Sequence, residues 1–78
     1  MTAADKVAEL TKREYQIVTL VAEGLKNKDI AERLCISPAT VRHHLSSIFT
    51  KLEVPDRLKL IVFAHRNSLA QMKNGLEK

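Results

Sequence analysis

The stretch from Lys28 to Leu52, KDIAERLCISPATVRHHLSSIFTKL, decides the fold because it holds two helix patterns with almost no gap between them. Ser37 followed by Pro38 is a strong helix start. Serine caps free backbone N–H groups, and proline at the first helical position loses no hydrogen bond. Apolar residues then recur at spacings of four, three and four, at Val41, Leu45, Ile48 and Leu52. The spacing predicts an amphipathic helix over residues 38–52.

A shorter helix, from about residue 28 to residue 34, is predicted just before this one. Asn27 is its predicted N-cap, and Asp29 lies in the first turn, where the helix dipole favours a negative charge. The inner side of this helix carries Ile30, Ala31 and Leu34. Only Cys35 and Ile36 separate the two helices before the serine cap. So short a link makes them cross steeply and share a core, which is the geometry of a helix-turn-helix.

The residues around the turn suit such a crossing. Ala31 is small enough to let the helices approach, Ile36 is expected to point from the turn into the core, and Val41 is expected to meet Ala31. Many such units have glycine at the position of Cys35, because the turn can require a positive φ there. An ordinary αα-hairpin inside a helical bundle is the alternative reading of the same pattern.

Two further helices flank this unit. Thr11 and Glu14 form a predicted capping box for a helix over residues 12–23, which Gly24 ends. Asp56 is expected to cap a fourth helix over residues 57–66. No segment alternates like a strand, so the predicted fold is all-α, a four-helix domain over residues 10–66. Residues 1–9 are expected to be a linker, and the tail over residues 67–78 is expected to extend the fourth helix through about Met72.

The outward side of the 38–52 helix is polar and carries no acid. A step of about 100° per residue places Ala39, His43, Ser46 and Thr50 on that side, with Arg42 and Ser47 beside it. No carboxylate lies between Glu32 and Glu53. Such a helix suits the major groove of DNA, where an arginine can make two hydrogen bonds to a guanine edge. The alternative is a solvated surface that happens to have few charges.

Lys28 gives a second indication of an anionic partner. A cation at a helix N-terminus opposes the helix dipole, and a phosphate bound there would reverse the penalty. An exposed lysine screened by water explains the residue equally well. The predicted fourth helix is apolar on more than its core side, since Leu58 and Val62 point away from Leu60, Ile61 and Ala64. A second copy of the same helix is the simplest partner; the alternative is that the tail after Asn67 covers them.

The composition excludes several function classes. A chain of 78 residues with a net charge of +4 makes one small domain, and its two glycines cannot form a Gly-rich phosphate loop. Its one cysteine excludes an internal disulfide. His43 and His44 are adjacent and diverge on a helix, so no metal site is expected, and no catalytic arrangement or cofactor either. Without an apolar span or leader, the chain is expected to be cytoplasmic, away from membranes, and not an enzyme.

These motifs resemble the DNA-binding domain of LuxR/FixJ-type bacterial transcription regulators. The resemblance covers about residues 10–66 and lies in Leu10–Glu14, Gly24–Ala31, Ile36–His44, Lys51–Leu52 and Arg57. It implies a dimer formed through the fourth helix, at Leu58 and Val62, with the 38–52 helix in the major groove. It implies base reading by Arg42 and His43; Ala39 and Ser46 stand at base-facing positions where some members have lysine. It implies phosphate contacts from Asn27, Lys28, Ser37, Thr40, His44 and Lys51.

The resemblance also implies a place in a larger protein. Such domains follow a receiver or a sensor domain in bacterial regulators, although stand-alone members of this size exist. The prediction is therefore sequence-specific binding to double-stranded DNA at the bacterial nucleoid, as the effector domain of a two-component response regulator. Two alternatives remain: a helical module that binds a protein and not DNA, and a sigma-factor promoter-recognition domain. The fourth helix, with Lys51-Leu52 and Arg57, argues against the second.

Overall fold

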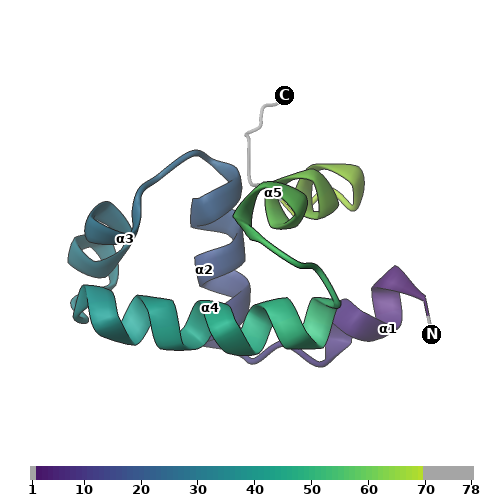
Figure 1. Ribbon diagram of the computed structural model, residues 1–78, viewed down its shortest axis with the longest axis horizontal. Helices are drawn as coiled ribbons and strands as arrows, with labels where there is room; N and C mark the ends of the chain where they lie inside the picture. The colour runs from purple at the N-terminus through teal and green to yellow at the C-terminus, as the bar shows by residue number, and fades with distance from the viewer. Residues whose placement is uncertain (1, 70–78) are drawn as a thin grey trace.

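Residues 2–69 are described by a computed structural model, and this part of the chain contains α-helices and no strand (Figure 1). The helices are α1 (Ala3–Ala8), α2 (Lys12–Ala22), α3 (Asn27–Leu34), α4 (Pro38–Leu52) and α5 (Arg57–Arg66). α4 runs along one side of the molecule, with α3 at one end, α1 at the other, and α2 and α5 above it (Figure 1). The predicted all-α class is confirmed, and α4 and α5 have the predicted bounds.

Three of the predicted N-caps are confirmed. The backbone N–H of Glu14 donates to Thr11 Oγ1 at 3.1 Å and Glu14 Oε1 accepts from the Thr11 N–H at 2.8 Å, which completes the capping box. Asp56 caps α5 by accepting from the Lys59 N–H at 2.9 Å. The Ser37 hydroxyl oxygen accepts from the backbone N–H of Thr40, at 3.0 Å.

The predicted N-cap of α3 is wrong. Lys26 occupies the cap position without a side-chain hydrogen bond, and Asn27 is the first residue of the helix. The amide oxygen of Asn27 instead accepts a hydrogen bond from Arg57 of α5 at 2.6 Å. The Asn27 side chain, which the local sequence predicts to cap the helix, is therefore engaged by a residue 30 positions away in the chain.

The four helices from α2 to α5 end in the same way. At each end one residue has a positive φ: Gly24 (95°), Cys35 (60°), Glu53 (58°) and Ser68 (57°). The following residue is apolar and donates its N–H five residues back, in the bonds Leu25→Leu20, Ile36→Ala31, Val54→Phe49 and Leu69→Ala64. These are Schellman motifs, which close the last turn and bring the apolar residue back against the helix. They explain why Ile36 packs against the core, as predicted.

The core lies where α2 meets α3, α4 and α5. The predicted inner side of α4 is confirmed, because Val41, Leu45, Ile48 and Leu52 are all buried. The sequence reading missed Ile17 and Leu20 of α2, which are buried as well. The amphipathic pattern predicts one buried side for a surface helix. Because α2 has neighbours on several sides, that pattern underestimates its buried surface.

The prediction that residues 1–9 form a linker is wrong for residues 3–8, which form α1. Thr2 and Asp5 make a second capping box, and the hydrogen bonds from the Thr2 backbone and side chain hold the pKa of Asp5 below its ordinary value. α1 packs on α4, and Lys6 lies 3.4 Å from the Glu53 carboxylate. The spacing of Thr2 and Asp5 is the sequence feature that could have indicated the start of this helix. So short a helix is stabilised mainly by packing against other segments, and local sequence does not show that packing.

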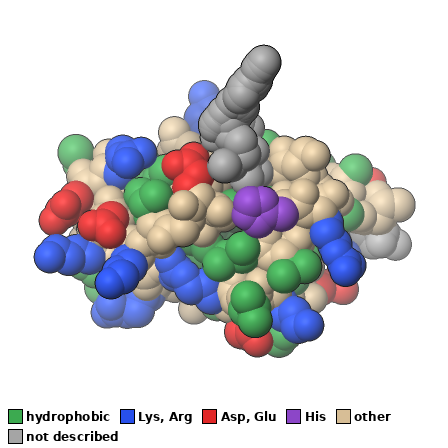
Figure 2. Space-filling view, turned by 90° about the horizontal axis from the view of Figure 1, so that it is seen from above, with side chains coloured by type: hydrophobic (Ala, Val, Ile, Leu, Met, Phe, Trp, Pro, Cys, Tyr) green, Lys and Arg blue, Asp and Glu red, His purple; other side chains and the backbone are tan. Residues whose placement is uncertain are grey.

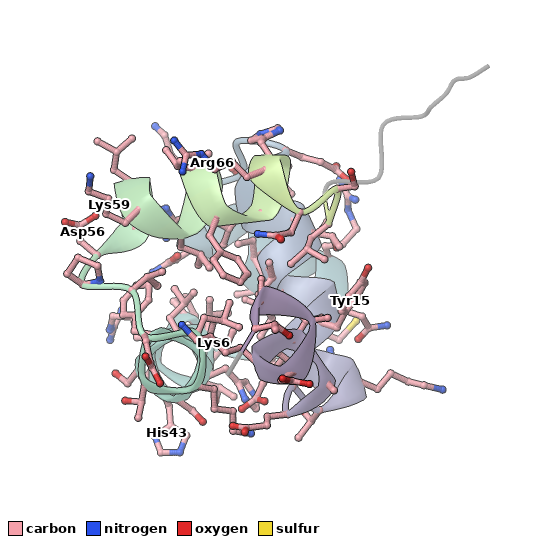
Figure 3. All side chains as sticks on the ribbon, turned by 90° about the vertical axis from the view of Figure 1, so that its right-hand side faces the viewer. Lys6, Tyr15, His43, Asp56, Lys59 and Arg66 are labelled. Carbon is pink, nitrogen blue, oxygen red and sulfur yellow. The ribbon has the colours of Figure 1, made fainter. Side chains whose placement is uncertain are left out.

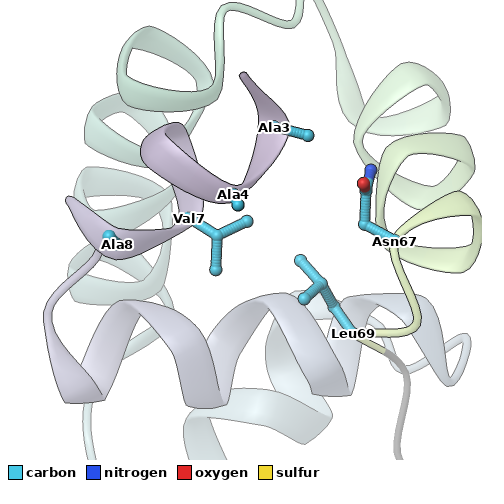
Figure 4. Close-up of a pocket in the computed structure, with 6 residues that line it drawn as sticks. All are labelled: Ala3, Ala4, Val7, Ala8, Asn67 and Leu69. Carbon is cyan, nitrogen blue, oxygen red and sulfur yellow. The ribbon is translucent and has the colours of Figure 1, made fainter. Parts of the chain in front are cut away.

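The predicted extension of α5 into the tail is also wrong within the described residues. α5 ends at Arg66, Ser68 has a positive φ, and Leu69 turns back into the core with only 6% of its surface exposed. Burial of Leu69 therefore takes the place of another helical turn. A hollow lies between Leu69, Asn67 and the small residues of α1 (Figure 4). The predicted continuation over residues 70–72 lies outside the described residues. Within residues 2–69, no helix is long and apolar enough to cross a membrane.

Candidate nucleic-acid interface

The helix-turn-helix prediction is confirmed by the packing of α3 on α4. Ala31 and Val41 are both buried, at 3% and 0% exposure, so the two backbones approach closely where the helices cross. Cys35 adopts the left-handed conformation, with φ 60° and ψ 43°, at the position where glycine is common. The turn keeps its usual geometry with cysteine in it, and the strain is borne at that one residue.

The outward side of α4 is exposed as predicted. Each of the four outward residues is exposed, namely Ala39, His43, Ser46 and Thr50. Arg42 is exposed beside them, whereas Ser47 is half-buried. His43 projects away from the rest of the molecule, beyond the outer edge of α4 (Figure 3). A helix that is anchored by one apolar side and bare on the other can enter a groove without rearranging.

The first turn of α4 also presents polar groups. Ser37 is exposed, and its hydroxyl lies 2.9 Å from that of Thr40, which is half-buried. His44 is half-buried, and its ring centre lies 6.3 Å from that of His43 with 60° between the ring planes. The two histidines therefore diverge, as adjacent residues on a helix do. Hydroxyl groups and a histidine in this position suit contacts to phosphate oxygens, which such side chains make in protein–DNA complexes.

The N-terminus of α3 lies near the start of α5. Arg57 donates to the amide oxygen of Asn27 at 2.6 Å and to the carbonyl oxygen of Leu25 at 2.7 Å. Lys28, the next residue, is exposed. Asn27 and Lys28 are thus together at the end of α3, where free backbone N–H groups and the helix dipole favour an anion.

Lys51, a predicted phosphate contact, lies half-buried in the last turn of α4 and forms an ion pair. Its ammonium nitrogen donates to Glu14 Oε1 at 2.8 Å, and the Glu14 side chain is only 6% exposed. Burial acts to raise the pKa of Glu14, but hydrogen bonds from Lys51, the Thr11 backbone and Ser47 outweigh it and lower the pKa to about 2. This ion pair ties the last turn of α4 to the first turn of α2.

Two residues important to this arrangement escaped the sequence reading. Glu14 was identified only as a capping residue, and Arg57 only through the family resemblance. Both bond to partners 30 or more positions away in the chain. The signal was indirect: each is a charged residue in the first turn of a helix. Their partners are fixed by tertiary structure alone.

Helix α5 exposes apolar surface away from this interface. Leu58 is 67% exposed and Val62 is 39% exposed, and they are the large hydrophobic residues that residues 2–69 leave exposed. The prediction that they point away from the core is confirmed. The face of the molecule that carries α5 shows hydrophobic side chains between lysines and arginines (Figure 2).

Comparison with known proteins agrees with this geometry. Residues 8–64 match the family described as bacterial regulatory proteins, luxR family. The chain is 52% identical over 60 residues to the transcriptional regulatory protein LiaR of Bacillus subtilis, covering 77% of this chain and 28% of LiaR. It is 42% identical over 62 residues to the response regulator protein VraR of Staphylococcus aureus, covering 80% of this chain and 30% of VraR.

The chain thus spans about a third or less of these relatives. A third relative, the uncharacterized transcriptional regulatory protein YxjL of B. subtilis, is 44% identical over 71 residues, which cover 90% of this chain and 33% of YxjL. The family match covers most of the chain and includes α2, α3, α4 and most of α5. With its helix-turn-helix and exposed α4, the chain belongs to the luxR family of bacterial regulatory proteins and is a DNA-binding domain of a transcription regulator.

Proposed function

We propose that this domain binds double-stranded DNA in a sequence-specific manner, with α4 in the major groove. One observation carries the proposal: α4 exposes a side free of carboxylates that holds Arg42 and His43, while its opposite side is fully packed. A major groove about 12 Å wide admits one helix, and each base pair presents a distinct pattern of donors and acceptors there. In a bacterium this activity places the protein at the nucleoid.

The proposed base contacts come from the outward residues of α4. Arg42 can donate two hydrogen bonds to the O6 and N7 atoms of guanine. His43 projects away from the molecule at the outer edge of α4 (Figure 3) and can donate to a guanine acceptor. Ser46 can bond to a base edge, and Ala39 can contact a thymine methyl group. These last two residues are small and uncharged, so Arg42 and His43 carry most of the proposed specificity.

The proposed phosphate contacts surround these residues. Lys28 and Asn27 face the backbone from the start of α3, while Ser37, Thr40 and His44 face it from the first half of α4. Lys51 joins this set from the last turn of α4: its ammonium pairs with Glu14, and two of its three N–H donors remain for a phosphate oxygen. Such contacts fix register and orientation and supply affinity that falls steeply with salt.

We also propose that two copies bind together through α5, at Leu58 and Val62. Exposed leucine and valine on a helix are best explained by a partner, and a two-fold axis lets one surface pair with itself. The relatives suggest a further part to the protein: this chain covers 30% of VraR, whose name is that of a response regulator. The proposed role is an effector domain, residues 10–66, joined to a receiver or sensor domain.

Selection of bound duplexes from a random pool, followed by a salt titration, tests the proposal. We expect one enriched half-site, repeated at a fixed spacing, and affinity that falls by orders of magnitude between about 50 and 200 mM salt if several phosphates are contacted. A module that only docks a protein through Leu58 and Val62 would enrich no sequence. Failure to enrich any sequence, with weak and equal binding to all duplexes, would contradict the proposed function.

A further inference from the structure

A hollow of about 390 Å³ lies beside the outward side of α4, where α3 begins and α5 begins. Its lining comes from α3, α4, α5 and the turn before α5: Asn27, Arg42, Leu45, Ser46, Phe49, Pro55, Asp56 and Arg57. Arg42 and Ser46 also belong to the proposed base-reading side. A duplex that received α4 in its major groove would therefore bring a flanking strand of its backbone close to this hollow.

Arg57 lines the hollow and is held there by two hydrogen bonds. It is half-buried and donates through one terminal nitrogen to Asn27 Oδ1 at 2.6 Å and through the other to the Leu25 carbonyl oxygen at 2.7 Å. A guanidinium has five N–H donors, so three remain after these two bonds. The bond to Asn27 also fixes the amide, because its oxygen faces Arg57 and its NH₂ group must point elsewhere.

The charge balance of the hollow favours an anion. Arg42 and Arg57 contribute two permanent positive charges, and Lys28 follows Asn27 directly. Asp56 is the acid in the lining, and its Oδ1 is turned to the N-terminus of α5, where it accepts from the Lys59 N–H at 2.9 Å. The N-terminus of α5 therefore binds the Asp56 carboxylate. The two positive guanidinium groups outnumber this single negative charge, so the lining has a net positive charge.

We propose that this hollow receives one phosphate of the DNA backbone, and that Arg57 is a phosphate-binding residue of the domain. Arg57 supplies charge and N–H donors from within the hollow, and it orients the Asn27 NH₂ group toward the same phosphate. Planar arginine donors suit phosphate oxygens better than a lysine ammonium does. This inference rests on the proposed function, because it requires α4 to bind in the major groove.

The position of Arg57 has a consequence for assembly. Arg57 is the first residue of α5, and Leu58, the proposed dimer contact, is the second. A phosphate held by Arg57 would fix the first turn of the helix through which a second copy docks. Binding of DNA and pairing of copies would then stabilise the same turn.

Replacing one backbone phosphate at a time with a neutral methylphosphonate tests this assignment. The probe is a set of duplexes of the selected sequence, each with one such replacement. For the wild-type protein we expect about a tenfold loss of affinity at the phosphate in the hollow, the scale of one charged hydrogen bond. Arg57→Gln should lose about tenfold on the unmodified duplex, and lose nothing further at that one phosphate. Its sensitivity at every other phosphate should match the wild type.

Two variants serve as controls. Lys59→Gln removes one positive charge from the same helix at an exposed residue outside the hollow, so it should keep the wild-type pattern at every phosphate. Arg57→Lys keeps the charge; it should retain the salt slope, bind unmodified duplex several-fold more weakly and lose part of the sensitivity at the single phosphate. Urea unfolding shows whether Arg57→Gln folds. If Arg57→Gln does not fold, the sensitivity of Arg57→Lys at the single phosphate tests the inference instead.

An Arg57 variant that folds and keeps the full wild-type sensitivity at every phosphate overturns the inference. Arg57 then only ties α5 to α3. Sequence-specific binding by the same variant would leave the proposed function standing. Absence of duplex binding by the wild-type protein would instead overturn the proposed function.

Discussion

At the scale of single residues, three residues other than glycine adopt the left-handed backbone conformation that usually favours glycine. Cys35, Glu53 and Ser68 all have positive φ, although only glycine adopts that conformation without steric penalty. Cys35 ends α3 in the turn that sets the crossing of α3 and α4. The turn is retained because its two hydrogen bonds and the burial of Ile36 outweigh a local penalty of about 1 kcal/mol.

Replacing Cys35 with glycine should stabilise the domain. Glycine removes the steric penalty, partly offset by the larger entropy of the unfolded chain, so the free energy of unfolding should rise by up to about 1 kcal/mol. Urea unfolding followed by circular dichroism measures the change. Cys35→Ala keeps the side-chain clash and is the matched control, which should leave stability nearly unchanged. A destabilised Cys35→Gly variant would show that the cysteine side chain makes a contribution beyond the turn.

Truncation of Arg42 and truncation of Lys28 to alanine should change DNA binding in different ways. Arg42→Ala should cost about 1–3 kcal/mol of binding free energy on the selected duplex and relax specificity at one base pair. Lys28→Ala should weaken binding to all sequences alike and reduce the salt slope by about one unit, because it removes one phosphate contact. Titrations of both variants with selected and random duplexes measure the difference. Equal losses of Arg42→Ala on both duplexes would contradict its base-reading role.

At the scale of elements, α4 is held at both ends by different forces. Apolar packing against α3, in which Ala31 and Val41 are both buried, holds its first half, and the ion pair of Lys51 with Glu14 holds its last turn. Glu14 accepts from two elements at once, since the same carboxylate caps α2 and binds α4. A buried acceptor with several donors is costly to leave unpaired, so this carboxylate specifies the position of α4 on α2.

The ionised Glu14 carboxylate should increase the free energy of unfolding, and this contribution should be lost at acid pH. Its pKa is lowered to about 2 in the folded state, so the stabilising effect is complete above its unfolded value near 4.5 and disappears as pH falls through about 2. This lowering of the pKa corresponds to about 3 kcal/mol of stability. Glu14→Gln should lower stability at pH 7 and flatten its dependence between those two pH values, as urea unfolding at several pH values would measure.

Glu23→Gln is the matched control for that experiment, because it removes the same charge from an exposed residue at the other end of α2. Its stability should follow the wild-type pH dependence closely. An acid dependence that persists unchanged in Glu14→Gln would show that other carboxylates govern acid unfolding.

At the scale of the whole molecule, the proposed DNA-binding surface and the proposed dimer surface lie on different helices. α4 runs along the bottom of the molecule and α5 lies above it (Figure 1), and the exposed Leu58 and Val62 belong to α5. This separation leaves α5 free to meet a second copy while α4 occupies a groove. For a small domain, two copies double the phosphate and base contacts without enlarging the core.

Aspartate at Leu58 and Val62 should abolish cooperative binding to paired half-sites. Charges placed on a two-fold apolar contact would meet their own copies, which is unfavourable. Affinity for a single half-site should stay within a few-fold of wild type, and titrations of one-site and two-site duplexes measure both. Gln16→Asp, at an exposed residue of α2, is the control. Intact cooperativity in the double variant would place the interface elsewhere.

The local sequence predicted most of the fold. The Ser37-Pro38 start, the capping residues Thr11 and Asp56, and the apolar spacing of α4 are interactions within a few residues, and the structure confirms them. The exposure of the outward side of α4 follows from the same spacing. The sequence reading failed for α1, for Ile17 and for the end of α5, because packing with distant segments decided each of them.

By itself, the sequence determined that the segments of α2, α3, α4 and α5 are helical, where α2, α4 and α5 begin, and which side of α4 stays bare. Those features depend on hydrogen bonds and spacings inside one segment, which the order of residues fixes. The tertiary structure decided that Lys51 pairs with Glu14, that Arg57 holds Asn27, and that Leu69 closes the core. These partners lie far apart along the chain, and only the packing of α2 against its neighbours brings such side chains within reach of one another.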